Sequence, residues 1–144
     1  MEESLKYLKE SFCLREVDVK SYSGLSLAYI GDDIYDLLIR TIVMSEGNMP
    51  VQKLHRKTSA LVKAPTQSAM MEFIQPVLNE EEKAVYKRGR NAKPHTVAKH
   101  ASHNDYRRAT GFEALMGYLY LTNQMERAID LMKVGLEGVK NGKE

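Results

Sequence analysis

The chain has 144 residues, a length typical of one domain that can bury its own hydrophobic core. Its 43% hydrophobic and 28% charged residues are typical of a globular protein, and no apolar run is long enough to span a membrane. The net charge of +2 excludes nucleic-acid binding through overall charge alone, so a binding surface would need locally clustered basic residues. The single Cys13 excludes an internal disulfide, and the N-terminus lacks a signal-peptide pattern. Both features favour a cytoplasmic protein.

Helical patterns cover most of the chain, and no segment has a convincing strand pattern. Proline, glycine and capping residues separate the helices, with Gly47 after a helix end, Pro50 at a helix start and Asn79 as an N-cap. The expected helices span residues 1–12, 25–44, 50–63, 66–73, 79–88, 104–121 and 125–137. We therefore predict an all-α fold that forms one domain over residues 1–144, with a frayed tail at about 138–144.

The helix expected over residues 25–40, LSLAYIGDDIYDLLIR, combines an apolar stripe with a pair of acids. The stripe consists of Leu27, Ile30, Ile34, Leu37 and Leu38. Asp32 and Asp36 are four residues apart, so their carboxylates project from one face. Gly31 costs roughly 1 kcal/mol against alanine inside a helix, which indicates that another helix or a ligand packs against the backbone there.

The helix expected over residues 110–121 is apolar almost all round but contains one acid, Glu113. Burying a carboxylate in such a segment is unfavourable unless it is paired, hydrogen-bonded or bound to a metal. One acid from each of two packed helices, Asp32 and Glu113, would form a small oxygen-ligand site of the kind that Mg2+ prefers. The alternative is that the helix containing Asp32 is an ordinary amphipathic core helix whose acids face solvent.

Basic residues cluster in a long loop expected over residues 88–103. They also cluster on one face of an earlier helix, residues 50–63. Such clusters are typical of phosphate contacts, although a solvated loop without specific function is the alternative. The candidate RNA-binding residues are Arg88, Arg90, Asn91, Lys93, Lys99, Arg107, Arg56 and Lys57. On the other side of the 50–63 helix, Val51, Leu54, Leu61 and Val62 are expected to face the core.

Other kinds of site find little support in the sequence. The spacing of His95, His100 and His103 matches no common zinc-ligand pattern. The chain also lacks a phosphate-binding glycine loop, a dinucleotide fingerprint and a nucleophile elbow, so no small-molecule cofactor is expected.

Several of these fragments together resemble the catalytic domain of the ribonuclease III family. They are the sequence YIGD at residues 29–32, the basic KRGRNAK at 87–93, the pair Tyr106 and Arg107, and FEAL at 112–115. The closer resemblance is to the short form of the family, Mini-ribonuclease III, because the chain ends soon after this domain with no room for a double-stranded-RNA-binding module.

The resemblance implies a Mg2+-dependent endoribonuclease, with Mn2+ as a substitute, that cuts double-stranded or structured RNA and leaves 5′-phosphate and 3′-hydroxyl ends. It implies Asp32 and Glu113 as catalytic metal ligands, a ribosomal RNA precursor as substrate, and a two-fold homodimer whose cleft takes the duplex. Ribonuclease III itself has two further acids, at the positions of Ala28 and Thr110 here. The short form, as the resemblance implies, works with this reduced set.

Two other functions remain open at this level. A binding module of the same fold could hold double-stranded RNA or pre-ribosomes without cutting, and the missing acids at Ala28 and Thr110 are compatible with it. A helical adaptor whose acids only cap or pair is the third, but it does not explain Glu113 in an apolar helix.

Overall fold

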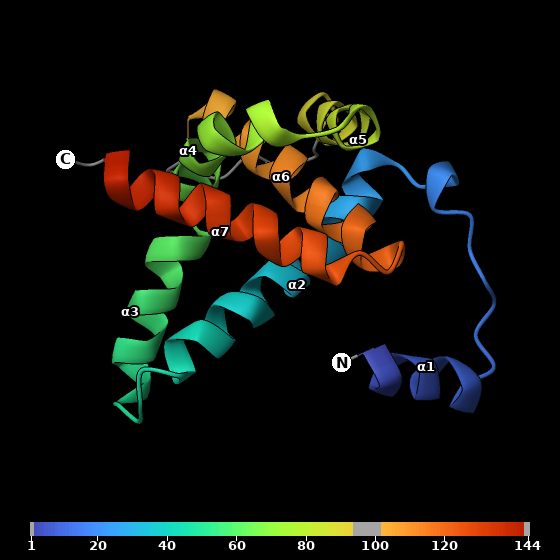
Figure 1. Ribbon diagram of the computed structural model, residues 1–144, viewed down its shortest axis with the longest axis horizontal. Coiled ribbons are helices and arrows are strands. Elements are labelled where there is room, and N and C mark those ends of the chain that lie inside the picture. The colour runs from blue at the N-terminus through green and yellow to red at the C-terminus, as the bar shows by residue number, and fades with distance from the viewer. Residues whose placement is uncertain (1, 94–101, 143–144) are drawn as a thin grey trace.

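The computed structural model describes residues 2–93 and 102–142, and every regular element within these ranges is helical (Figure 1). The α-helices are α1 (Glu2–Ser11), α2 (Gly24–Met44), α3 (Val51–Val62), α4 (Ala64–Ile74), α5 (Glu80–Arg90), α6 (His103–Leu121) and α7 (Met125–Gly142). Two short 3-10 turns, η1 (Val19–Ser21) and η2 (Gln75–Val77), connect some of them. The predicted all-α fold is confirmed. No helix in the described part of the chain is both long and apolar enough to cross a membrane.

Side-chain caps explain where the helices begin. Ser23 caps α2 by accepting a hydrogen bond from the Ser26 amide. Asn79 forms the predicted cap of α5, as part of a capping box with Glu82. The sequence favours Asn104 or Asp105 as the cap of α6, but the cap is Ser102, which accepts a hydrogen bond from the Asp105 amide.

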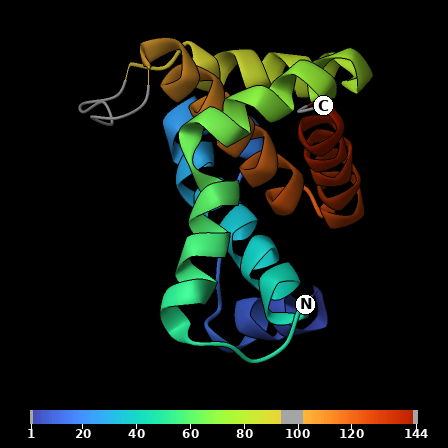
Figure 2. The same ribbon diagram turned by 90° about the vertical axis from the view of Figure 1, so that its left-hand side faces the viewer.

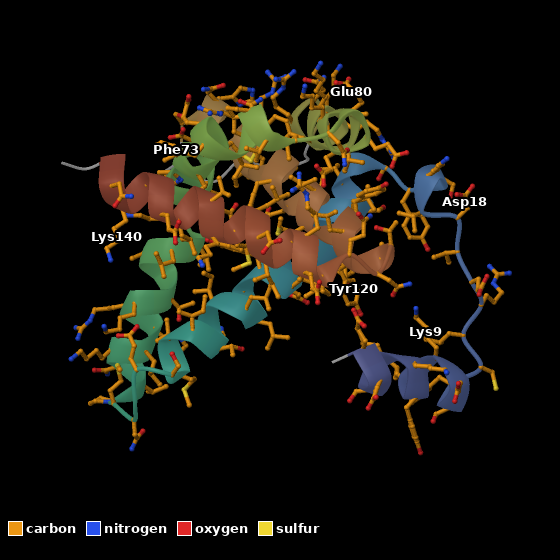
Figure 3. The ribbon with its side chains drawn as sticks, in the orientation of Figure 1. Lys9, Asp18, Phe73, Glu80, Tyr120 and Lys140 are labelled. Carbon is orange, nitrogen blue, oxygen red and sulfur yellow. The ribbon has the colours of Figure 1, made fainter. Side chains whose placement is uncertain are left out.

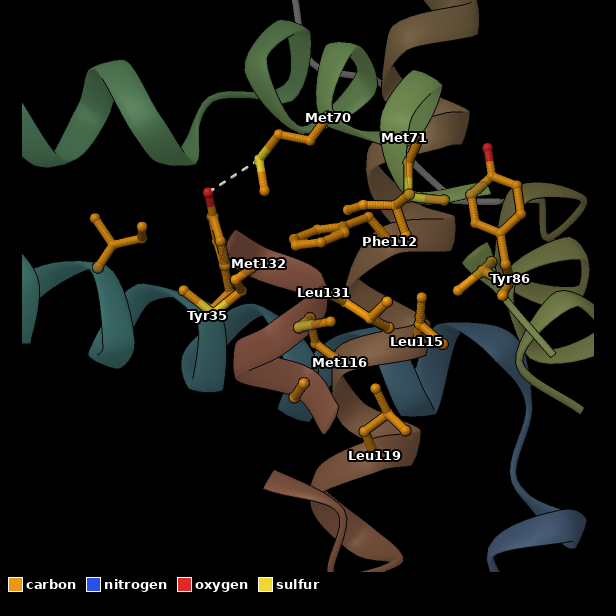
Figure 4. Close-up of a cluster of buried hydrophobic side chains, with 14 of the residues drawn as sticks. Tyr35, Met70, Met71, Tyr86, Phe112, Leu115, Met116, Leu119, Leu131 and Met132 are labelled. Atoms are coloured by element: carbon orange, nitrogen blue, oxygen red, sulfur yellow. Dashed lines mark hydrogen bonds between the residues drawn. The ribbon is translucent and has the colours of Figure 1, made fainter. Parts of the chain in front are cut away.

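Helix α6 lies in the middle of the fold, in contact with α2, α4, α5 and α7 (Figure 2). Its residue Phe112 packs edge-on against Tyr35 of α2, with ring centroids 4.9 Å apart. The Tyr35 hydroxyl is buried but satisfied, because it donates to Leu61 O and to Met70 Sδ (Figure 4). Methionine and leucine side chains from α4, α6 and α7 fill the space around this pair. The core therefore holds α2 and α6 in a fixed relative position.

Two predicted details differ from the structure. Val51 does not face the core but is 62% exposed at the first position of α3. Leu54, Leu61 and Val62 do pack against the core as predicted. Helix α7 continues to Gly142, beyond the predicted start of the tail at residue 138.

Helix α1 lies apart from the other helices in Figure 1, and residues 12–18 connect it to η1 (Figure 3). None of its residues is buried. Leu8 and Phe12 are 45% and 71% exposed, so the apolar face of this amphipathic segment is largely uncovered within the described chain. An open apolar cleft separates it from the C-terminal end of α6, lined by Leu5, Tyr120 and Leu121 among others.

One partly buried ion pair, between partly exposed Arg127 and buried Glu82, joins α5 to α7. Arg127 Nε donates to Glu82 Oε2 at 2.8 Å, and Arg127 Nη2 donates to Glu82 Oε1 at 2.9 Å and to Val77 O at 2.8 Å. The hydrogen bonds from Arg127 hold the pKa of Glu82 below its usual range, despite the burial of this carboxyl. The resulting stabilisation is present above the ordinary glutamate pKa and is lost as the pH falls through the lowered one.

We expect Arg127→Ala to lower the free energy of unfolding by roughly 2–3 kcal/mol, because it leaves the Glu82 carboxylate buried and unpaired. The control is Arg40→Ala, which removes the exposed pair with Asp36 and should change stability by less than about 1 kcal/mol. Urea denaturation measures both. Equal losses of stability in the two variants would show that the Glu82–Arg127 pair stabilises the fold no more than an exposed ion pair does.

Candidate metal centre and nucleic-acid interface

The backbones of α2 and α6 touch where two glycines meet. A Cβ atom on Gly31 would overlap the carbonyl oxygen of Glu113 and lie 2.7 Å from the Gly117 nitrogen. A Cβ atom on Gly117 would in turn overlap the carbonyl oxygen of Leu27. The packing partner predicted from Gly31 is therefore a helix rather than a ligand. This close crossing brings Asp32, the residue after Gly31, next to Glu113.

The carboxyl groups of Asp32 and Glu113 interact at this crossing. Asp32 is exposed, whereas Glu113 is partly buried. Burial, followed by the hydrogen bond and charge of Asp32, raises the pKa of Glu113 to about 9. The Gln67 amide acts in the opposite direction and lowers this pKa. Without a cation, Glu113 therefore carries a proton near neutral pH.

The donor set fits a hard divalent cation with few protein ligands. Within residues 2–93 and 102–142, no three His, Cys, Asp or Glu side chains gather into a metal-binding group. Two adjacent carboxylates are nevertheless enough for Mg2+, which often keeps several water ligands and binds one or two protein carboxylates. A cation would also offset the repulsion between two ionised acids held side by side. Asp32 and Glu113 are the residues that could hold it.

The other acids of α2 do not join this pair through any hydrogen bond. Asp36, which shares a helix face with Asp32, pairs instead with Arg40 at 2.8 Å. The positions where ribonuclease III has additional acids are both buried here. Ala28 is 7% exposed, and Thr110, also 7% exposed, donates its hydroxyl to Tyr106 O. The structure thus offers a two-acid site.

The raised pKa of Glu113 predicts how the stability of the metal-free protein depends on pH. Between the ordinary glutamate pKa and about 9, the native state binds a proton that the unfolded state lacks, so stability falls as the pH rises. The slope from this one group is at most about 1.4 kcal/mol per pH unit. In EDTA, Glu113→Gln should flatten the decline of Tm between about pH 6 and 8. An unchanged decline in the variant would contradict a protonated Glu113.

Part of the predicted RNA-binding set lies where α5 ends and α6 begins. Arg107 Nε donates to the Arg90 carbonyl oxygen at 3.1 Å, and the Arg90 guanidinium lies 5.7 Å from the centre of the Tyr86 ring. Asn91, the C-cap of α5, accepts from Arg90 Nε at 3.4 Å. Arg88 and Arg90 are therefore helical, whereas the sequence predicted a loop from residue 88.

Of the remaining predicted basic residues, one follows α5 and the others lie on α3 or outside the described residues. Lys93 is exposed at the end of a described segment, and Lys99 lies outside the described residues, as do His95 and His100. Arg56 is exposed on α3, which packs on α2 and α4. Lys57, also on α3, pairs with Glu46 at 2.7 Å. The described part of the chain thus presents two separate basic surfaces, one on α3 and one at the α5–α6 junction.

Gln67 is the residue at this site that the sequence analysis missed. It lies in the first turns of α4 and is 1% exposed. A glutamine in a methionine-rich helix gives no sign of a distant carboxylate partner, because that partner depends on how α4 packs against α6.

Comparison with known proteins agrees with these observations. Residues 25–124 match the Ribonuclease III domain family. The chain is 50% identical over 129 residues to Mini-ribonuclease 3 of Clostridium tetani, covering 89% of this chain and 84% of that one. It is 41% identical over 141 residues to Mini-ribonuclease 3 of a Thermoanaerobacter species, covering 97% and 99% of the two chains.

A solved structure has the same fold. The crystal structure of a protein from Fusobacterium nucleatum superposes with a TM-score of 0.76 at 33% sequence identity, covering 84% of this chain and 97% of that chain. Together with the two acids at the helix crossing, these matches identify the chain as an endoribonuclease that belongs to the ribonuclease III domain family and, within it, to the Mini-ribonuclease 3 group.

Proposed function

We propose that this endoribonuclease is Mg2+-dependent, that it cleaves double-stranded or structured RNA with Asp32 and Glu113 as the metal ligands, and that it leaves 5′-phosphate and 3′-hydroxyl ends. The observation that supports this most is the pairing of Asp32 and Glu113 across the closest contact of α2 and α6. Mn2+ should substitute for Mg2+, because both accept oxygen ligands in octahedral geometry.

The two acids differ in how accessible they are to the substrate. Asp32 is exposed, so a phosphodiester can reach it, whereas Glu113 is partly buried on the central helix. The Gly31–Glu113 backbone contact keeps the two carboxyl groups at a constant spacing. When bound there, a divalent cation would lower the pKa of a coordinated water and offset charge on the phosphate. Glu113 must lose its proton to act as a ligand, so we expect cation binding to release a proton.

The basic surface at the α5–α6 junction suits an interface that contacts the sugar–phosphate backbone of RNA. Arg90 and Arg107 are held by contacts with Tyr86 and with the α5 backbone, so their guanidinium groups lose less freedom on binding a phosphate. Double-stranded RNA is recognised largely by shape, through phosphate and 2′-hydroxyl contacts. We assign Arg88, Lys93, Lys99 and the α3 residues Arg56 and Lys57 to the same task.

The test is cleavage of an end-labelled duplex RNA and of its single strands at low salt, with Mg2+, Mn2+ or EDTA. We expect cutting of the duplex only, with either cation, and no cutting in EDTA. Mapping of the product ends checks the 5′-phosphate. Duplex binding without cutting under any of these conditions would favour the alternative, a non-cleaving double-stranded-RNA or pre-ribosome binding module.

We further propose that the natural substrate is a ribosomal RNA precursor. The family resemblance supports this assignment, and a stem of precursor RNA should be cut at a defined position more efficiently than a duplex of arbitrary sequence and equal length. Equal rates and scattered positions on both RNAs would argue against it.

We also propose a two-fold homodimer, because cutting both strands of a duplex requires two sites. Two exposed apolar side chains on α2 support it, since Tyr29 is 81% exposed and Leu37 is 46% exposed. Tyr29 lies three residues before Asp32, so such an interface would adjoin the site.

Tyr29→Glu should convert the dimer into monomers and reduce double-strand cleavage at least about tenfold, because a carboxylate would be buried in an apolar interface. The control is Ile129→Glu, which alters an exposed apolar side chain on α7 instead of α2. Light scattering coupled to gel filtration gives the mass of each protein. A monomeric wild type, or a dimeric Tyr29→Glu, would contradict the proposed interface.

A further inference from the structure

Gln67 contains a buried polar atom that the rest of the fold leaves unsatisfied. Its Nε2 lies in the interior and has no hydrogen-bond partner within the described part of the chain. Other buried polar side chains are satisfied there: Glu82 binds Arg127, and Thr110 binds Tyr106 O. Leaving a buried amide unpaired costs about 1–3 kcal/mol, so this group needs an explanation.

The surroundings of Gln67 indicate what its amide is for. It comes from α4, on the side of α6 that carries Glu113, and its amide faces the Glu113 carboxyl without reaching a hydrogen bond of ordinary geometry. Asp32 approaches the same carboxyl from α2. Glu113 therefore lies between an acid at the surface and an amide donor in the interior.

We propose that Gln67 is a positioning residue that orients the Glu113 carboxylate for metal binding through a hydrogen bond from its Nε2. A carboxylate that gives one oxygen to a cation keeps lone pairs on the other oxygen, and these are normally satisfied by a neighbouring donor. A hydrogen bond from Gln67 Nε2 to the Glu113 carboxylate would satisfy the unpaired amide and the free carboxylate oxygen together. The amide then fixes which carboxylate oxygen faces Asp32.

Two variants test this proposal by removing the hydrogen-bond donor of Gln67 while keeping the approximate size of its side chain. Gln67→Met has nearly the same length but donates no hydrogen bond, and Gln67→Glu keeps the shape but replaces the NH2 group with oxygen. Ser68→Ala is the control, because Ser68 is the adjacent buried polar residue on α4 and is 2% exposed. Mn2+ binding by calorimetry and Tm in EDTA are measured for each protein, along with cleavage as a function of Mg2+ concentration.

We expect Gln67→Met to weaken Mn2+ binding on the order of tenfold. Its Tm in EDTA should equal or exceed that of the wild type, because an unsatisfied buried donor has been removed. Cleavage should require a correspondingly higher Mg2+ concentration, and Gln67→Glu should not restore it. Ser68→Ala should bind Mn2+ as the wild type does.

The proposal is overturned if Gln67→Met binds Mn2+ with wild-type affinity, or if Ser68→Ala loses as much affinity as Gln67→Met. The inference rests on the proposed metal site, and its failure can be distinguished from failure of that site. If the wild type itself binds no Mn2+, the metal site is wrong; if only the Gln67 variants behave as wild type, the metal site stands and Gln67 has no positioning role.

Discussion

Asp32→Asn should reduce the rate of duplex cleavage on the order of a thousandfold while leaving the fold and RNA binding intact. Asparagine keeps the size of the side chain but removes the charge that would hold a divalent cation. Asp32 is exposed, so the substitution disturbs no packing and Tm should stay within a few degrees of the wild type. The measurement is single-turnover cleavage at saturating Mg2+, alongside a filter-binding assay for the duplex.

The matched control for this prediction is Asp36→Asn. It alters the acid one helical turn further along α2, which pairs with Arg40 instead of Glu113, and should retain cleavage within a few-fold. Undiminished cleavage by Asp32→Asn, or an equal loss in both variants, would show that the reaction does not centre on Asp32.

Gly31→Ala should destabilise the protein by roughly 3 kcal/mol and lower Tm by roughly 6–12 °C. The added methyl group would overlap the backbone carbonyl of Glu113, and a backbone cannot move aside as a flexible side chain can. The gain of about 1 kcal/mol in helix propensity from alanine is too small to offset this overlap. Separation of α2 from α6 would also move Asp32 away from Glu113, so cleavage should fall further than stability alone explains.

Gly142→Ala provides the control for that substitution. A Cβ atom there would lie 3.4 Å from the ring of Phe73, an ordinary contact, and the position is at the end of α7. Its stability should change by less than about 0.5 kcal/mol. Thermal unfolding in EDTA compares the three proteins, and a Gly31→Ala variant as stable as the wild type would contradict the close crossing of α2 and α6.

The helices and the two acids could be predicted from the sequence because their signals are local. Apolar periodicity marked α2 and α6, and Asn79 marked the start of α5. Gly31 indicated a close backbone contact because glycine inside a helix is unfavourable without one. A single acid in an apolar helix likewise singled out Glu113 before its partner was known.

Features that depend on long-range packing could not be predicted in this way. The Glu82–Arg127 pair joins residues 45 positions apart, and neither residue is distinctive within its own helix. Gln67 faces Glu113 only because α4 packs on α6. Boundary errors such as the cap at Ser102 arose because several neighbouring residues can serve as caps, and tertiary contacts select one of them.

The most direct test of a metal site shared by Asp32 and Glu113 is a titration with Mn2+ in the absence of RNA. Electron paramagnetic resonance measures the bound Mn2+ for the wild type, Asp32→Asn and Glu113→Gln. We predict one class of site in the wild type, accompanied by proton release, and loss of that site in both variants. Wild-type Mn2+ binding by both variants would contradict the site.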